Sequence, residues 1–380
     1  MKNEQFIKII TFWKQVGQDY IQTFKNIAGN FSILTTMILS VIFYSFFYPI
    51  AYKSQTAEQL PIVIVDEEQS VLTTQLITAI SNSPNVAIID ISHNFEEAKY
   101  LVQTQKADGI LLLPEHLSES LIRGETGGIG LYLSGANFLK TKQIGLGIAT
   151  AVENTIAEYL SRFAQVTHFS PALPIHQIPI FNTLSGYGSY IFPAVAPLII
   201  HQTLLLGLCM LIGGYREKQW RASRAEFLAI YLVALTIGTL GCLYLFGFTF
   251  WLNDYPRGGN FFGMLCAVPI FISAVIGLAF FIASYLDTSE RAGHLIVFSS
   301  VPLFLLSGTA WPLQAMPEWM QMFSQLLPST QGINLFVQLN QMGVSTQLIL
   351  PKLIYLLFIS LILLSLSWYR LGVFIKKIHK

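Results

Sequence analysis

Six stretches of apolar residues constrain this chain more than any other feature. They occupy residues 31–52, 190–212, 227–251, 262–286, 294–311 and 353–371. A helix needs about 20 apolar residues to cross the hydrocarbon core of a bilayer, at a rise of about 1.5 Å per residue. A soluble fold would need a charged surface, yet only 11% of the residues are charged. We therefore predict an α-helical integral membrane protein with six transmembrane helices.

The first stretch, residues 31–52, follows about thirty polar and amphipathic residues and is not followed by a small-residue cleavage site. A cleaved signal peptide has a shorter leader and a shorter apolar core, so we predict that this segment is an uncleaved signal anchor. The other five stretches define a five-helix transmembrane domain over residues 190–380.

The stretch at 294–311 is short and runs into SGTAWPLQAMP. This composition predicts irregular or re-entrant backbone near residues 305–343, which a membrane tolerates only under a cover of protein or water. The alternative is a belt of aromatic side chains, including Trp311 and Trp319, with a helix at the membrane interface.

Lysine and arginine are distributed unequally about the predicted spans. One side would carry thirteen of them, against Arg257 and Lys352 in the short loops opposite. Because loops with more Lys and Arg stay in the cytoplasm, both termini are predicted to be cytoplasmic and residues 53–189 extracytoplasmic. The thirteen are Lys2, Lys8, Lys14, Lys25, Arg216, Lys218, Arg221, Arg224, Arg291, Arg370, Lys376, Lys377 and Lys380.

Residues 53–189 change to a different pattern. Short β-rich runs at 61–66, 85–91, 107–114 and 128–135 alternate with helical patterns at 70–80, 94–105, 115–122 and 138–163. This alternation predicts a small α/β domain inserted between the first and second spans. Asn94 and Glu97 have the spacing of a capping box. Asp66, Glu67 and Glu68 fit a turn after a strand, or alternatively a cation site.

Two segments on the predicted cytoplasmic side are candidates for docking a partner. Residues 1–30 contain apolar side chains at helical spacing, which predicts an amphipathic helix that either anchors the first span or binds a partner. The loop at 213–226 is rich in charge and is predicted to form a short helix beneath the bilayer. Its basic residues are equally typical of a loop that only sets orientation.

Several strings together resemble the ABC-2 type permease family, the membrane subunits of bacterial ABC exporters. These are PIVIVDEEQS, ADGILLLPEHLSESLIRGE, YREKQWRASRAEFL and SGTAWPLQAMPEWMQMFSQLLPSTQGINLFVQLNQMG, in that order along nearly the whole chain. The resemblance implies export that is driven by ATP hydrolysis in a separate subunit. The chain has no GxxxxGK[ST] phosphate-binding motif, which agrees with a transmembrane subunit that is not an enzyme and holds no cofactor itself.

By this resemblance, the ATP-binding cassette subunit would dock on the 213–226 loop and the N-terminal helix. The coupling residues would be Arg216, Glu217, Lys218, Arg221 and Arg224. Glu217 matches a glutamate that family members carry there, but the following KQWRASRAEFL departs from the family pattern of a second acidic residue and a Gly-Thr turn. The resemblance further implies a second permease copy or a paralogue as a partner, with a periplasmic adaptor as an additional candidate. It also implies a location in the bacterial inner membrane.

Four residues are candidates for the translocation path. His201, followed by Gln202, lies near the middle of a predicted span, where an ionisable group is costly and hence a functional candidate. A neutral histidine that hydrogen-bonds across helices is the alternative. Trp311 and Pro312 would line the outer end of the path. The apolar spans favour a hydrophobic or amphipathic substrate, moved through a cavity between the second and fifth spans of two subunits.

Two other functions are weighed against export. An ion-coupled secondary transporter would need acidic residues or paired broken helices at membrane depth, and no Asp or Glu lies inside any predicted span. A membrane receptor or scaffold acting through its outer domain would not require five further spans. The net charge of +1 identifies no partner by itself. We expect membrane lipid as a partner and no nucleic acid.

Overall fold

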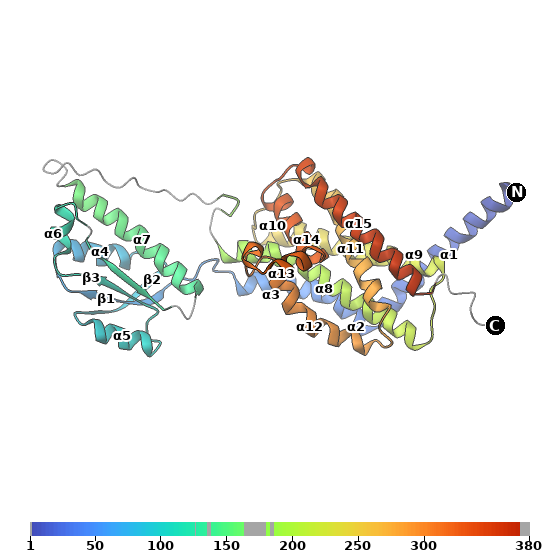
Figure 1. The fold of residues 1–380 in the computed structure, drawn as a ribbon, viewed down its shortest axis with the longest axis horizontal. Coiled ribbons are helices and arrows are strands. Elements are labelled where there is room, and N and C mark those ends of the chain that lie inside the picture. The colour runs from blue at the N-terminus through green and yellow to red at the C-terminus, as the bar shows by residue number, and fades with distance from the viewer. Residues whose placement is uncertain (1, 126, 135–137, 163–179, 183–185, 373–380) are drawn as a thin grey trace. The chain divides into compact units, whose positions relative to one another are not determined.

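The computed structural model describes residues 2–125, 127–134, 138–162, 180–182 and 186–372. The chain divides into two compact units (Figure 1). One, the α/β unit, is Ser54–Ile178, and the other, the helical unit, combines Met1–Lys53 with Pro179–Lys380.

The α/β unit contains a four-stranded sheet in the order β2-β1-β3-β4. Its strands are β1 Leu60–Asp66, β2 Val86–Ser92, β3 Gly109–Leu113 and β4 Gly130–Leu133. β1 runs parallel to both β2 and β3, whereas β4 pairs antiparallel with β3. All four lie within the runs predicted from the sequence or extend them by one residue, so the alternation of short apolar runs with helices was a sound guide.

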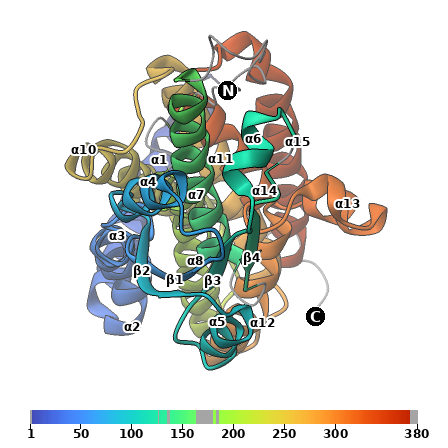
Figure 2. The same cartoon turned by 90° about the vertical axis from the view of Figure 1, so that its left-hand side faces the viewer.

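Helices cover both faces of this sheet (Figure 2). Helices α4 Val71–Ser81 and α7 Phe138–Ser161 share one apolar core with Ile62 and Leu111, while α5 Phe95–Gln103 packs over Val63 and Val65 on the other face. The short α6 Leu117–Ile122 follows β3. Strands buried on both faces explain why the β1 sequence reads as an almost continuous apolar run.

Two local predictions in this unit have clear outcomes. The capping box at Asn94 and Glu97 is wrong. Asn94 does cap α5, by accepting from the Glu96 amide at 2.9 Å, but the Glu97 carboxylate accepts from the Ser92 hydroxyl at 2.8 Å instead. Asp66 forms a turn, since its side chain accepts from the amides of Glu68 and Gln69, and among the described residues no cluster suited to a metal is found.

In the helical unit, five helical segments are long and apolar enough to cross a membrane. They are Phe31–Ala51, Tyr187–Glu217, Arg224–Leu252, Phe261–Ala283 and Thr346–Arg370. The predicted fifth span corresponds to α12 Glu290–Leu306, which has 17 residues and is shorter than a usual span. The count of six spans therefore stays a prediction, whereas a multi-pass helical membrane protein is established.

The elements of this unit follow one another in a simple order. α1 Lys2–Gly29 precedes the first span, and α8 Tyr187–Glu217 is buried against α3, α11, α12 and α14. Three helices contain wide π-helical turns, at η1 Thr35–Leu39, η2 Tyr244–Thr249 and η4 Val337–Gln341. The remaining segments are α2 Phe31–Leu34, α3 Ser40–Ala51, α9 Arg224–Leu243, α10 Phe250–Leu252, α11 Phe261–Ala283, η3 Leu313–Ala315, α13 Glu318–Gln325, α14 Pro328–Phe336 and α15 Thr346–Arg370.

Residues 305–343 form short helices with contrasting surroundings. α13 exposes Trp319, Met322 and Phe323, whereas α14 is buried along almost its whole length. Gly332 permits this burial, because a Cβ there would lie 2.2 Å from the ring of Phe271. Protein thus covers the irregular backbone around α14, as such backbone requires in a membrane. That this segment is re-entrant stays a prediction.

Candidate functional site

The connection between α8 and α9 is shorter than predicted. α8 continues to Glu217 and α9 begins at Arg224, so the separate helix expected within 213–226 is wrong. Gln219 adopts a left-handed conformation, with φ 56°, which ends α8. Ser223 and Glu226 then start α9 with a capping box. The loop is therefore only Lys218–Ser223, and it connects two long helices directly.

Arg216 and Glu217 attach the end of α8 to the turn between α11 and α12. The Arg216 guanidinium donates to the Ser284 carbonyl oxygen and lies 4.0 Å from Asp287. The Ser289 amide donates to the Glu217 carboxylate at 2.9 Å. Gly213 allows the turn to approach, because a Cβ there would lie 2.7 Å from the carbonyl oxygen of Thr288. Glu217 therefore satisfies a backbone donor within its own chain.

Arg370, in the last turn of α15, reaches the same turn. Its Nε donates to the Ser284 hydroxyl at 3.1 Å, and its guanidinium carbon lies 3.7 Å from the centre of the Tyr285 ring. The sequence showed Arg370 only as a basic residue near the C-terminus. Its pairing with residues 86 positions away could not be read from spacing.

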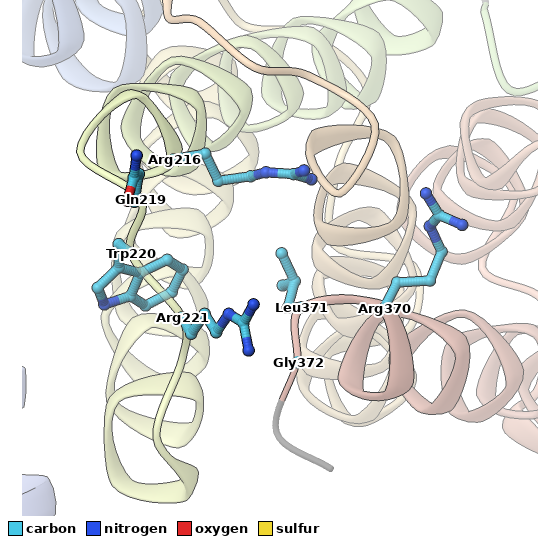
Figure 3. Close-up of a pocket in the computed structure, with 7 residues that line it drawn as sticks. All are labelled: Arg216, Gln219, Trp220, Arg221, Arg370, Leu371 and Gly372. Atoms are coloured by element: carbon cyan, nitrogen blue, oxygen red, sulfur yellow. The ribbon is translucent and has the colours of Figure 1, made fainter. Parts of the chain in front are cut away.

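Three arginines surround a cavity of about 420 Å³ at this end of the helical unit, which we call the arginine cavity (Figure 3). In Figure 3, Arg216 extends from α8, Arg221 from the loop and Arg370 from the end of α15. None of the described residues that line it is acidic, so the cavity is suited to an anion. It is lined by Arg216, Gln219, Trp220, Arg221, Arg370, Leu371 and Gly372.

The predicted coupling residues are thus only partly brought together. Arg216 and Arg221 share the arginine cavity, whereas Glu217 faces the α11–α12 turn. Lys218 is exposed at the end of α8. Arg224 lines a separate pocket of about 230 Å³ with Phe12 of α1. Lys376, Lys377 and Lys380 lie outside the described residues.

The N-terminal helix is confirmed as a helix and packs on the rest of the unit. The Tyr20 hydroxyl donates to Thr236 at 3.1 Å, and the Asn26 amide donates to the Tyr215 hydroxyl at 2.8 Å. Burial raises the pKa of Asp19, whose Oδ2 atom has no partner among the described residues. Nearer its N-terminus, α1 exposes apolar side chains such as Trp13. Anchoring and partner binding both stay predictions.

The four candidate pathway residues do not form one site. His201 is fully buried in α8, and neither ring nitrogen has a hydrogen-bond partner in the part of the chain that the structure describes. The amide of Gln202 also lacks one there. Trp311 is 58% exposed, beyond the end of α12, and Pro312 precedes η3. The cross-helix hydrogen bond expected of a structural histidine is thus not seen among the described residues.

Gln202 instead borders a groove of about 540 Å³ between α3, α8 and α12, which we call the tyrosine groove. Tyr44, Tyr48 and Tyr52 lie one helical turn apart along α3, and Tyr187 of α8 packs edge-on against Tyr52. The rest of the lining is mostly apolar. α8 and α12 contain the second and fifth spans, which were predicted to line the path, whereas α3 of the first span was not among the predicted wall elements.

These features define a multi-pass helical membrane protein with a separate α/β unit. A model of the ABC-2 family transporter proteins matches residues 31–369, and the chain belongs to this family. The match covers the whole α/β unit and the five candidate spans, apart from Arg370 at the end of the last one.

Two kinds of relatives share about a fifth to a quarter of their aligned residues with this chain. ABC transporter G family member 20 of Dictyostelium discoideum is 24% identical over 77% of this chain, which spans 40% of that protein's length. The probable multidrug ABC transporter permease YbhR of Escherichia coli K12 is 20% identical over 77% of this chain and 80% of its own length. No solved structure matches.

Proposed function

We propose that this chain is the permease subunit of an ABC-2 type exporter, driven by ATP hydrolysis in a separate ATP-binding cassette subunit. Its membership of the family supports this, as does the lack of a phosphate-binding motif in its sequence. The loop Lys218–Ser223 would face the cytoplasm, with the α/β unit outside a bacterial inner membrane. A second permease copy or paralogue would complete the path, and a periplasmic adaptor would be a further partner.

One observation carries the coupling role: a single turn joins four helix ends. Arg216 and Glu217 bind the turn from α8, and Arg370 binds it from α15, while the turn itself connects α11 with α12. A partner that moves the Lys218–Ser223 loop would therefore move four helices at once. This arrangement suits rigid-body switching between inward and outward access, with ATP closing the partner ATPase dimer.

The tyrosine groove supports a hydrophobic or amphipathic substrate. Its surface is mostly apolar, and Tyr and Gln202 side chains supply a few polar groups. The permease from E. coli carries the words "probable multidrug" in its name, which fits a groove of this chemistry. His201 is buried next to Gln202 in α8, so we expect a change at His201 to alter the packing of this wall of the groove.

Co-purification followed by coupled transport tests the proposal. An ATPase subunit that stays with the chain supports an exporter, and its absence would favour an ion-coupled transporter or a receptor. In the reconstituted complex, Arg216→Ala and Glu217→Ala are expected to lower substrate-stimulated ATP hydrolysis and export together. Lys106→Ala, which removes an exposed charge from the α/β unit, is the matched control. Intact coupling in both test variants would refute the assignment of these residues.

A further inference from the structure

The acidic side chains nearest the arginine cavity do not line it. Asp287 lies 2.6 Å from Arg291 and 4.0 Å from Arg216, and Glu217 accepts from the Ser289 amide. Glu226 accepts from the Ser223 amide and the Trp220 indole. In sequence, residues 373–380 follow the cavity with three more lysines and no acid. An anion entering the cavity would meet the guanidinium groups of three arginines.

A second feature lies along the neighbouring helices. A groove of about 650 Å³, which we call the apolar groove, runs between α11, α12 and α15 and is bordered by α8 and α13. Phe281, Leu303, Phe358 and Ile362 are among its walls, and almost all of its lining is apolar. α11 and α15 are both candidate spans, so in a bilayer the groove would lie at the depth of the hydrocarbon. A water-soluble partner would not reach it.

A stack of side chains connects these two features. Phe281 lines the apolar groove, and its ring centre lies 5.3 Å from that of Tyr285. The Arg370 guanidinium lies over the Tyr285 ring, and Arg370 also lines the arginine cavity. On α15, Ile362 precedes Arg370 by about two turns, a rise of roughly 12 Å. The distance suits one molecule with an anionic head and an apolar chain.

We propose that this end of the helical unit binds an anionic phospholipid, with its phosphate in the arginine cavity and an acyl chain in the apolar groove. Arginine forms paired, charge-assisted hydrogen bonds with phosphate, and basic pockets between transmembrane helices hold anionic headgroups. An acidic peptide would satisfy the arginines but leave the groove empty. The site goes beyond the proposed transport function and does not depend on it.

Lipid retention by the purified full-length chain tests this. Native mass spectrometry would count phosphatidylglycerol and phosphatidylcholine bound after exposure to equimolar mixed micelles. Wild-type protein is expected to retain phosphatidylglycerol preferentially. Arg221→Gln should weaken that retention about fivefold, and adding Arg370→Gln should weaken it about 25-fold, as expected for loss of basic groups near an anionic lipid. Lys218→Gln, with the same charge loss outside the cavity, should retain the lipid.

Further variants separate the two halves of the site and protect the test against misfolding. Ile362→Trp fills the apolar groove and should lower retention although every arginine remains. Arg221 is exposed, so Arg221→Gln is informative even if Arg370→Gln fails to fold. Heating curves of the same samples should show stabilisation by phosphatidylglycerol, and not by inorganic phosphate alone.

Four outcomes would overturn the proposal. Equal retention of the two lipids would mean no anionic preference, and equal loss in Arg221→Gln and Lys218→Gln would mean no defined site. Equal stabilisation by inorganic phosphate would identify a soluble anion as the ligand. If Arg221→Gln released the ATPase subunit but kept the lipid, the cavity would instead serve that protein partner.

Discussion

Gly213→Ala is expected to detach the α11–α12 turn from the end of α8. The added Cβ would lie 2.7 Å from the Thr288 carbonyl oxygen and 3.2 Å from the Ser289 amide nitrogen. Both are backbone atoms, so no side chain can rotate away to make room. The turn must move by several tenths of an ångström, and the hydrogen bond from the Ser289 amide to Glu217 is the contact most directly affected.

The magnitude follows from three opposing effects. Alanine favours the helix by about 1 kcal/mol relative to glycine. Overpacking costs about 1 to 3 kcal/mol, and losing a hydrogen bond to a charged group costs about 1.5 to 3 kcal/mol. Together these give a loss of about 1.5 to 5 kcal/mol. Because the Ser289–Glu217 hydrogen bond is exposed to solvent, we expect the lower end, about 2 kcal/mol, which is a factor of roughly 30 in the equilibrium of the packed turn.

Gly214→Ala provides the matched control, because the neighbouring glycine is in the same helix but has space. Its Cβ would make an ordinary contact, 3.9 Å from the Ser289 Cβ. This variant should be slightly more stable than wild type, through helix propensity alone. The two variants therefore differ in the sign of the effect although they make the same chemical change one residue apart.

Heating the detergent-purified protein measures the first consequence, and substrate-stimulated ATP hydrolysis in the reconstituted complex measures the second. Gly213→Ala should melt roughly 4 °C below wild type and lose stimulation, whereas Gly214→Ala should do neither. If both variants behave alike in the two assays, the close approach of the turn to α8 is not what links these helices.

Three further predictions concern other parts of the chain. Gly332→Ala places a Cβ 2.2 Å from the Phe271 ring, so it should destabilise α14 by about 1 to 3 kcal/mol in thermal unfolding; unchanged melting would mean that the packing is looser than described. Asp19→Asn should stabilise α1 slightly near pH 7, by less than about 1 kcal/mol for a partly exposed group, because burial raises the pKa of Asp19 and the folded state loses stability as the pH rises through that pKa. The gain should vanish in acid, and heating curves across pH would show whether it does. Leu76→Ala should cost the α/β unit about 3 kcal/mol, as it empties a fully buried site, while Val71→Ala on the exposed side of the same helix should cost little; amide hydrogen exchange of the sheet would compare them.

Much of the fold was predictable because its signals are local. Hydrophobic stretches locate five candidate spans, and short β-rich runs locate all four strands. The length of α12 marks the limit of this approach, since composition near residue 294 does not define where the helix starts. Its first turns, from Glu290, are polar.

The α8–α9 connection was mispredicted although its signals were present. Ser223 and Glu226 have the S-x-x-E spacing of a capping box, which places the start of α9 before any separate helix could fit. The charged residues of 213–226 favour a helix of their own, but the cap at Ser223 leaves no room for it. By contrast, the left-handed Gln219 has no sequence signature, because glutamine seldom adopts this conformation.

The candidate site was predictable only in part, because its contacts are non-local. Charge placement identified Arg216 and Arg221, but the cavity also needs Arg370 from the far end of the unit's sequence. Likewise, Glu97 does not accept from the Asn94 amide, because that amide donates to the Ser92 hydroxyl at 3.0 Å and the hydroxyl in turn donates to Glu97. Side chains with several possible partners are decided by tertiary packing.

The three π-helical turns have a consequence for how this chain tolerates changes in length. A π turn holds one more residue than an α turn, so Thr35–Leu39 and Tyr244–Thr249, which have helix on both sides, each contain a surplus position. Deleting one residue there would restore regular α-helix and leave the flanking faces in place, whereas Val337–Gln341 ends its helix. The same deletion in uninterrupted helix, as in Phe261–Ala283, would rotate every later side chain by about 100° and bury the wrong face.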